Sequence, residues 1–126
     1  MTAFVIDTSI IIDVLRGNQE AASTLRDARR RGQLYASEIT RTEVLSGMRT
    51  AEEERTRGLL QLFVWRSVDE AHAELAGKLG RDWLPKYRGI DSADLVIAAT
   101  ASLLDARLLT RNVKHFPMFE RLTSPY

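Results

Sequence analysis

Cysteine is absent from the 126-residue sequence, which excludes disulfide bonds and thiolate metal ligands. This absence fits the reducing cytoplasm, where we expect the protein to act. No stretch approaches the roughly 18 apolar residues of a membrane span, and no basic start leads into a leader-like segment, so we expect no membrane association. Internal repeats, low-complexity segments and linkers are also lacking, and the length suits a single domain, residues 1–126.

A strong charge of one sign is lacking too. Eighteen basic residues stand against seventeen acidic ones, which leaves a formal net charge of +1. A net value near zero hides local patches, so it neither indicates nor excludes a nucleic-acid partner. The positions of individual charges therefore carry the evidence.

Short apolar strands alternate with helical segments, which predicts an α/β domain with a mostly parallel sheet of four or five strands, covered by helices on both faces. The expected strands are residues 3–6, 33–37, 64–68 and 106–110, with a fifth at 121–124. The expected helices are residues 8–16, 20–31, 38–48, 51–63, 68–85 and 90–105. The predicted helix starts are Thr8 or Ser9, Ser37, the Thr50–Glu53 pair and the Ser67–Glu70 pair.

Asp7 follows the first apolar strand directly, in "AFVIDTSIII". A surface loop would scatter its charge, whereas this acid lies where a buried strand should leave the sheet. In open parallel sheets, ligands bind outside the carboxyl ends of the strands. Residues 110–112 follow the fourth expected strand in the same way, so this edge of the sheet is the candidate site.

Asp91 and Asp94 interrupt a segment that is otherwise apolar, "IDSADLVIAATASLLD". Being three residues apart, they share one face of a helix, above the small side chains of Ala98 and Ala101. Acids in a first helical turn also favour the helix start by about 0.3–1 kcal/mol. This alternative accounts for Asp91 as well as a functional role does. It suits Asp94 less well, because Asp94 already lies within the apolar body.

Glu43 projects on the side of its expected helix that carries the small residues Ser46 and Gly47. Thr40 and Glu43 have the spacing of a capping box, which would make this acid structural. Ser37 is the better helix start, however, and it places Glu43 in the second turn. We therefore favour a functional role for Glu43.

Asp7, Glu43 and Asp94 each have a reason to point toward one end of the sheet. Two unit charges about 4 Å apart repel by roughly 4 kcal/mol at an effective dielectric constant of 20. Such a cluster either holds protons or binds a cation. Without cysteine and with two histidines, an all-oxygen site favours Mg²⁺ or Mn²⁺ over zinc. A hard metal with open positions indicates phosphodiester hydrolysis.

Four segments, in this order, resemble the PIN-domain ribonuclease family, and in particular the VapC-type toxins of bacterial toxin–antitoxin pairs. They are "VIDTSIIIDVL" at 5–15, "SEITRTEVLSG" at 37–47, "DLVIAATA" at 94–101 and "LLTRNVKHF" at 108–116. The resemblance implies a three-layer PIN-like fold and a Mg²⁺- or Mn²⁺-dependent endoribonuclease that leaves 5′-phosphate and 3′-hydroxyl ends. It also implies a homodimer and a cognate VapB-like antitoxin whose C-terminal segment enters the active-site groove.

The resemblance assigns roles residue by residue. Asp7 and Asp94 would hold Mg²⁺, with Mn²⁺ as a substitute, and Glu43 would position or deprotonate the attacking water. The supporting positions and the additional acid of the cleft are Thr8, Ser9, Thr110, Asn112 and Asp91. Asn112 stands where many members carry a fourth acid. Since an amide adds no charge, the number of metal ions stays open between one and two.

Arg111 and Lys114 adjoin Asn112, and we expect them to contact the phosphates of the RNA substrate. The basic segment "RDARRR" at 26–31 is more typical of a solvated helix face or of a contact between subunits. His115 is expected to have no particular role. Asp13 is expected to pair with Arg16, three residues on, and to lie outside the site.

Two alternatives remain. A receiver-type signalling domain has a similar length and sheet, but it needs a phospho-accepting aspartate at the end of its middle strand. Here Asp69 is expected to start a helix, and Thr8 stands where a second acid would follow Asp7. The other alternative is a catalytically inactive PIN-like binding module, which the presence of all three main acids disfavours.

Overall fold

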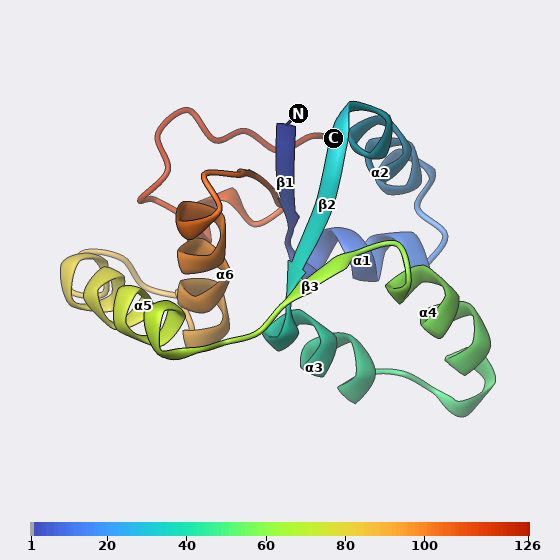
Figure 1. The fold of residues 1–126 in the computed structure, drawn as a ribbon, viewed down its shortest axis with the longest axis horizontal. Coiled ribbons are helices and arrows are strands. Elements are labelled where there is room, and N and C mark those ends of the chain that lie inside the picture. The colour runs from blue at the N-terminus through green and yellow to red at the C-terminus, as the bar shows by residue number, and fades with distance from the viewer. Residues whose placement is uncertain (1) are drawn as a thin grey trace.

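The strands of the computed structural model, which describes residues 2–126, form one sheet between two layers of helices (Figure 1). They are β1 (Thr2–Ile6), β2 (Gly32–Ser37), β3 (Val64–Arg66) and β4 (Arg107–Leu109), in the order β3-β2-β1-β4, and every pairing is parallel. The predicted α/β class is confirmed. The fifth strand at 121–124 is wrong, because this segment is irregular and Arg121 has a φ of 63°, outside the extended region.

The helices fill the connections between the strands. They are α1 (Thr8–Leu15), α2 (Gln19–Arg31), α3 (Glu38–Ser46), α4 (Glu53–Leu60), α5 (Glu70–Trp83) and α6 (Ser92–Leu103), with 3₁₀ turns η1 (Thr50–Glu52) and η2 (Val113–His115). Figure 1 shows α5 and α6 on one side of the sheet and α1, α2 and α4 on the other. No helix within residues 2–126 is both long and apolar enough to cross a membrane.

Ser37 is the N-cap of α3, as predicted, and its hydroxyl accepts a hydrogen bond from the backbone N–H of Ile39. The N-cap of α1 is Asp7 rather than Thr8 or Ser9. The N-cap of α5 is Asp69, which was expected to start a helix, and the Ser67–Glu70 pair is wrong. In place of Thr50 and Glu53, it is Glu52 that accepts from the backbone N–H of Arg49.

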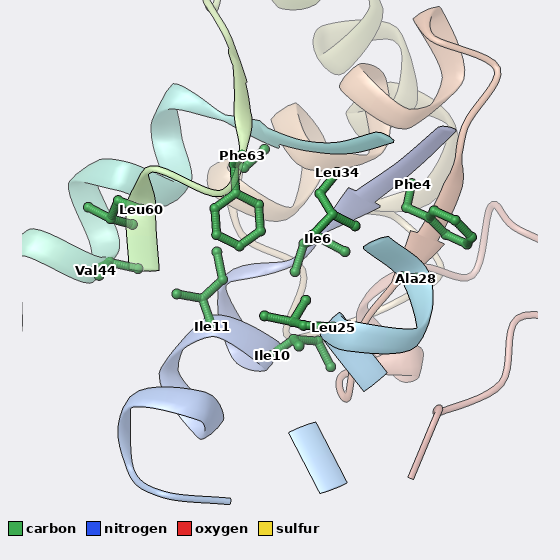
Figure 2. Packing of buried hydrophobic residues seen from close by; sticks show 11 residues of the cluster. Phe4, Ile6, Ile10, Ile11, Leu25, Ala28, Leu34, Val44, Leu60 and Phe63 are labelled. Atoms are coloured by element: carbon green, nitrogen blue, oxygen red, sulfur yellow. The ribbon is translucent and has the colours of Figure 1, made fainter. Parts of the chain in front are cut away.

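Alternate side chains of β1 pack into two separate apolar cores, one on each face of the sheet. Phe4 and Ile6 pack with α1 and α2 in one cluster, which Figure 2 shows from close by. Val5 points to the opposite face and packs against Ile97 and Ala98 of α6. All five side chains are at most 1% exposed. Burial on both faces explains the unbroken apolar run of this strand and fixes it as the centre of the domain.

Gly32 begins β2 directly opposite Thr2 of β1. A Cβ atom added at residue 32 would lie 1.8 Å from the backbone oxygen of Thr2. Only glycine therefore permits the first pairing between the two central strands.

Candidate active site

The carboxyl ends of β1 and β4 meet at one edge of the sheet and bring Asp7 beside residue 110. The backbone N–H of Asp7 donates to the carbonyl oxygen of Leu109 at 2.9 Å, which continues the strand pairing past the end of β1. Helix α3 starts directly after β2 and carries Glu43, while Asp94 lies in the first turn of α6. The predicted edge therefore collects acids from three different elements.

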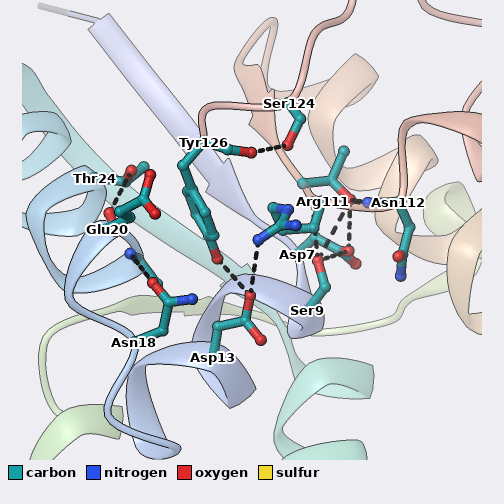
Figure 3. Close-up of polar contacts among 12 residues, drawn as sticks. Asp7, Ser9, Asp13, Asn18, Glu20, Thr24, Arg111, Asn112, Ser124 and Tyr126 are labelled. Carbon is teal, nitrogen blue, oxygen red and sulfur yellow. Dashed lines mark hydrogen bonds and ion pairs between the residues drawn. The ribbon is translucent and has the colours of Figure 1, made fainter.

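Asp7 is 3% exposed, and two hydroxyl groups hold its carboxylate. Ser9 Oγ donates to Asp7 Oδ2 at 2.6 Å, and Thr110 Oγ1 donates to the same oxygen at 2.7 Å (Figure 3). Although Asp7 is the N-cap of α1, its side chain makes no capping hydrogen bond. Neutral donors thus orient this acid without cancelling its charge.

Glu43 is held by the hydroxyl of Thr8, which precedes Ser9 at the start of α1. Thr8 Oγ1 donates to Glu43 Oε1 at 2.7 Å and lies 3.0 Å from Thr40 Oγ1, with which it shares a hydrogen bond. Glu43 therefore faces α1 from the second turn of α3, and the capping-box alternative with Thr40 is excluded by the N-cap at Ser37. Thr8 and Ser9, which sequence reasoning treated as interchangeable, orient different acids.

Asp91 and Asp94 form a reciprocal capping box at the start of α6. The backbone N–H of Asp94 donates to Asp91 Oδ1 at 2.8 Å, and the backbone N–H of Asp91 donates to Asp94 Oδ2 at 3.1 Å. Asp91 is exposed, whereas Asp94 is 7% exposed. The position of Asp91 is explained by its role as the N-cap of α6, which was the alternative to a functional role. This role does not account for the burial of Asp94.

Burial raises the pKa of Asp94 to about 6 from its ordinary 3.8, despite the hydrogen bond from the Asp91 backbone. The negative charges of Asp91 and Asp7 raise this pKa further, and His115, whose Nδ1 lies 3.1 Å from Asp94 Oδ2, lowers it. The effect of Asp7 is the smallest of these, so burial and Asp91 account for most of the rise. A cation bound at this edge would relieve the cost of keeping this carboxylate ionised.

The donor set suits a hard cation held partly by water. Within residues 2–126, no three side chains among the histidines, aspartates and glutamates are grouped tightly enough to enclose a metal ion by themselves. Mg²⁺ commonly binds one or two carboxylates and keeps several waters. Asp7 and Asp94, both buried at this edge, are the pair that fits this mode. Glu43 of α3 joins the site through its hydrogen bond from Thr8, the residue after Asp7.

The segment after β4 supports Asp7 through Thr110, which is fully buried. The Thr110 hydroxyl also accepts a hydrogen bond from the backbone N–H of Asn112 at 2.9 Å, so it fixes the turn that carries Asn112. Arg111, Asn112 and Lys114 are exposed beside it. Exposure leaves these side chains available to a ligand at this edge.

Sequence reasoning missed several residues of this region. Thr40 contacts the hydroxyl of Thr8, and His115 contacts Asp94. Asp13 pairs with Arg111 rather than with Arg16 as predicted. Tyr126 also reaches Asp13, with Oη donating to Oδ2 at 2.7 Å (Figure 3). The partners of Asp13 lie 98 and 113 residues away in the sequence, so local spacing carries no signal for them.

Asp69, the residue on which the receiver alternative depends, does not end a middle strand. It follows the edge strand β3 by three residues and caps α5, accepting from the backbone N–H of His72 at 3.1 Å. The His72 ring lowers the pKa of Asp69 through a further hydrogen bond. These contacts are those of a helix start, as expected from the sequence.

Comparison with known proteins identifies the family of this fold. The family model of the PIN domain matches residues 4–121. Ribonuclease VapC19 of Mycobacterium tuberculosis is 44% identical over 122 residues, which cover 96% of this chain and 98% of that protein. Ribonuclease VapC10 of the same organism is 39% identical over 121 residues, covering 96% and 91%.

A solved structure gives the same result in three dimensions. A toxin–antitoxin complex from Klebsiella pneumoniae contains a chain that superposes with a TM-score of 0.80 at 30% identity, over 97% of each chain. The fold and its acidic edge define a nuclease-like α/β domain of three layers. The chain belongs to the PIN-domain family, and its likeness to the VapC ribonucleases extends over nearly its full length.

Proposed function

We propose that this protein is a Mg²⁺- or Mn²⁺-dependent endoribonuclease and the toxin of a toxin–antitoxin pair. The observation that carries the proposal is the presence of two buried acids, Asp7 and Asp94, at the carboxyl edge of the sheet. The names of the curated relatives, both ribonucleases, support RNA as the substrate. The toxin–antitoxin complex with the same fold supports an antitoxin protein as the partner, and the likeness to the VapC ribonucleases makes a VapB-like protein the candidate.

Each acid receives a role from its surroundings. Asp7 and Asp94 would hold the ion, directly or through water, because both are buried acids at the same edge of the sheet. When bound there, a divalent ion would supply stabilisation of the negative charge that develops at phosphorus during the displacement. Glu43, oriented by Thr8, accepts a proton from the attacking water. Asp91 adds negative charge beside Asp94 and keeps the start of α6 in place.

The residues after β4 would meet the substrate. Arg111 and Lys114 are exposed cations that follow β4, whose carboxyl end lies beside Asp7. Phosphate contacts from such residues position a nucleic acid without reading its sequence. Asn112 offers an amide oxygen to the ion or to a water. We expect the cleavage products to carry 5′-phosphate and 3′-hydroxyl ends.

The antitoxin would bind beside Glu43. A cleft of about 110 Å³ opens there between α1, α3 and α4. Apolar side chains and charges of both signs share its lining and offer contacts to a peptide chain; they include Ile12, Leu15, Val44, Arg16 and Glu52. We also expect a homodimer, on the strength of the family resemblance.

The test is cleavage of RNA by the Asp7→Asn variant. Asparagine keeps an oxygen that can accept from Ser9 and Thr110, so the fold should survive while the charge is lost. We expect Mg²⁺-dependent cleavage to fall about 100-fold or more, a loss typical of removing one group that stabilises charge in a transition state.

Asp69→Asn is the matched control, since asparagine caps a helix as well as aspartate does. This variant should cleave like the wild type. It would also test the receiver-type alternative, in which Asp69 is the phospho-accepting residue. Mapping of RNA ends after brief expression of each variant would identify the substrate. Unchanged cleavage by Asp7→Asn would overturn the assignment.

A further inference from the structure

The guanidinium group of Arg111 is held from two sides (Figure 3). Its Cζ atom lies 4.4 Å from the centre of the Tyr126 ring, and its Nη1 lies 3.5 Å from Asp13 Oδ2. The same carboxylate oxygen accepts a hydrogen bond from Tyr126 Oη at 2.7 Å. Asp13, Arg111 and Tyr126 therefore form a closed triangle of contacts, which we call the Arg111 clamp.

The Arg111 clamp joins segments that are remote in sequence and ties them to the acidic edge. Asp13 lies on α1, and the backbone N–H of Arg111 donates to Ser9 Oγ at 3.1 Å. The Ser9 hydroxyl in turn donates to Asp7. The main chain of Arg111 is thus fixed against the candidate active site, and its side chain is fixed separately by Asp13 and Tyr126.

The clamp leaves much of the guanidinium free. Arginine has five N–H donors, of which one points to Asp13, and one flat face lies against the ring. The Arg111 side chain is 40% exposed. Burial, together with the hydrogen bond to Asp13, raises the pKa of Tyr126 to about 12, so the phenol stays a donor throughout the neutral pH range.

We propose that Asp13 and Tyr126 are positioning residues, which hold the Arg111 guanidinium ready to bind a phosphate of the RNA strand beside the acidic edge. This inference rests on the proposed function and adds two residues to it. An arginine that is ordered before the substrate arrives loses less side-chain freedom on binding. The contribution to RNA affinity should therefore be about 3- to 10-fold.

The test combines Tyr126→Ala with Arg111→Ala in one cycle of variants. Steady-state cleavage of an RNA oligonucleotide gives KM and kcat, and anisotropy of the labelled oligonucleotide in EDTA gives binding without cleavage. We expect Tyr126→Ala to raise KM and weaken binding about 3- to 10-fold, with kcat within about 2-fold. In the Arg111→Ala background, the same change should have no further effect, because the two residues act as one unit.

Conservative and control variants separate positioning from general stability. Tyr126→Phe keeps the ring beneath the guanidinium and should stay within about 2-fold of the wild type. Asp13→Ala, which leaves the ring in place, should repeat the KM effect if Tyr126→Ala does not fold. Asp27→Ala removes the exposed ion pair with Arg30 on α2 and should change neither KM nor binding.

Three results would overturn the inference. The first is additive losses in the double variant, and the second is a Tyr126→Ala protein that cleaves and binds like the wild type. The third is tighter RNA binding by Tyr126→Ala, which would mean that the clamp withholds Arg111 from the substrate. A wild-type protein that neither binds nor cleaves RNA would instead overturn the proposed function, and this inference with it.

Discussion

At neutral pH, Asp94 should lower the free energy of unfolding of the metal-free protein. Replacing it by asparagine should restore this stability. The pKa of this carboxyl is about 6 in the fold, against an ordinary 3.8. Each pKa unit corresponds to about 1.36 kcal/mol, so ionised Asp94 lowers the free energy of unfolding by up to ~3 kcal/mol relative to a neutral side chain. Asparagine retains an oxygen for the Asp91 backbone N–H. Because its amide has its own cost of burial, we expect a gain of about 1–3 kcal/mol.

The sign of the pH dependence follows from linkage. A carboxyl whose folded pKa is raised contributes its full stabilisation below pH 3.8, where it is protonated, and loses that contribution as the pH rises through about 6. Asp94→Asn has no such loss. The stability of the variant relative to the wild type should therefore rise by up to ~3 kcal/mol between pH 4 and pH 7, from a value near pH 4 that the burial cost of the amide sets.

Urea unfolding in EDTA, followed by the fluorescence of Trp65 and Trp83, measures this difference at each pH. Asp82→Asn, an exposed change on α5, is the control and should give no pH-dependent gain. Mn²⁺ added in place of EDTA should stabilise the wild type and not Asp94→Asn, since the ion takes over the neutralisation of the acids. Equal stability of the two proteins at all pH values in EDTA would refute the reasoning on charge. Mn²⁺ without effect on the wild type would favour the inactive binding module.

Two further changes probe the strand pairing and the second hydroxyl. Gly32→Ala should lower the free energy of unfolding by several kcal/mol, because its Cβ meets the backbone of Thr2, whereas Gly58→Ala on open helix surface should raise it by ~0.5–1 kcal/mol. Urea denaturation decides this, and similar values for the two variants would contradict the packing argument. Thr8→Val should reduce RNA cleavage by about 10- to 100-fold through a misplaced Glu43, with circular dichroism unchanged. Cleavage at the wild-type rate would show that Glu43 needs no such support.

Local pattern was enough to predict the sheet and the edge at which the acids gather. The apolar residues before Asp7 and those of α6 are too many to lie at the surface. Both segments therefore pack at the centre of the domain. The choice of Ser37 over Thr40 as a helix start also placed Glu43 in the second turn. These predictions rest on periodicity and capping, which act over a few residues.

Other features depend on contacts that no local pattern encodes. Thr8 and Ser9 have the chemistry of caps, yet their hydroxyls are taken by Glu43 and Asp7, and the backbone at Asp7 starts the helix instead. Residues 121–124 have the composition of a strand, but the sheet gains no fifth member. The partners of Asp13 come from the chain after β4, which packs against α1 only in the folded protein.

One dipeptide at the start of α1 therefore links two carboxylates that come from different parts of the chain. Since Thr8 and Ser9 belong to the same turn, a tilt of this short helix would displace together Glu43 and Asp7, the acids to which we assign water activation and ion binding. A molecule that wedges against α1 could thus switch off hydrolysis without touching either acid.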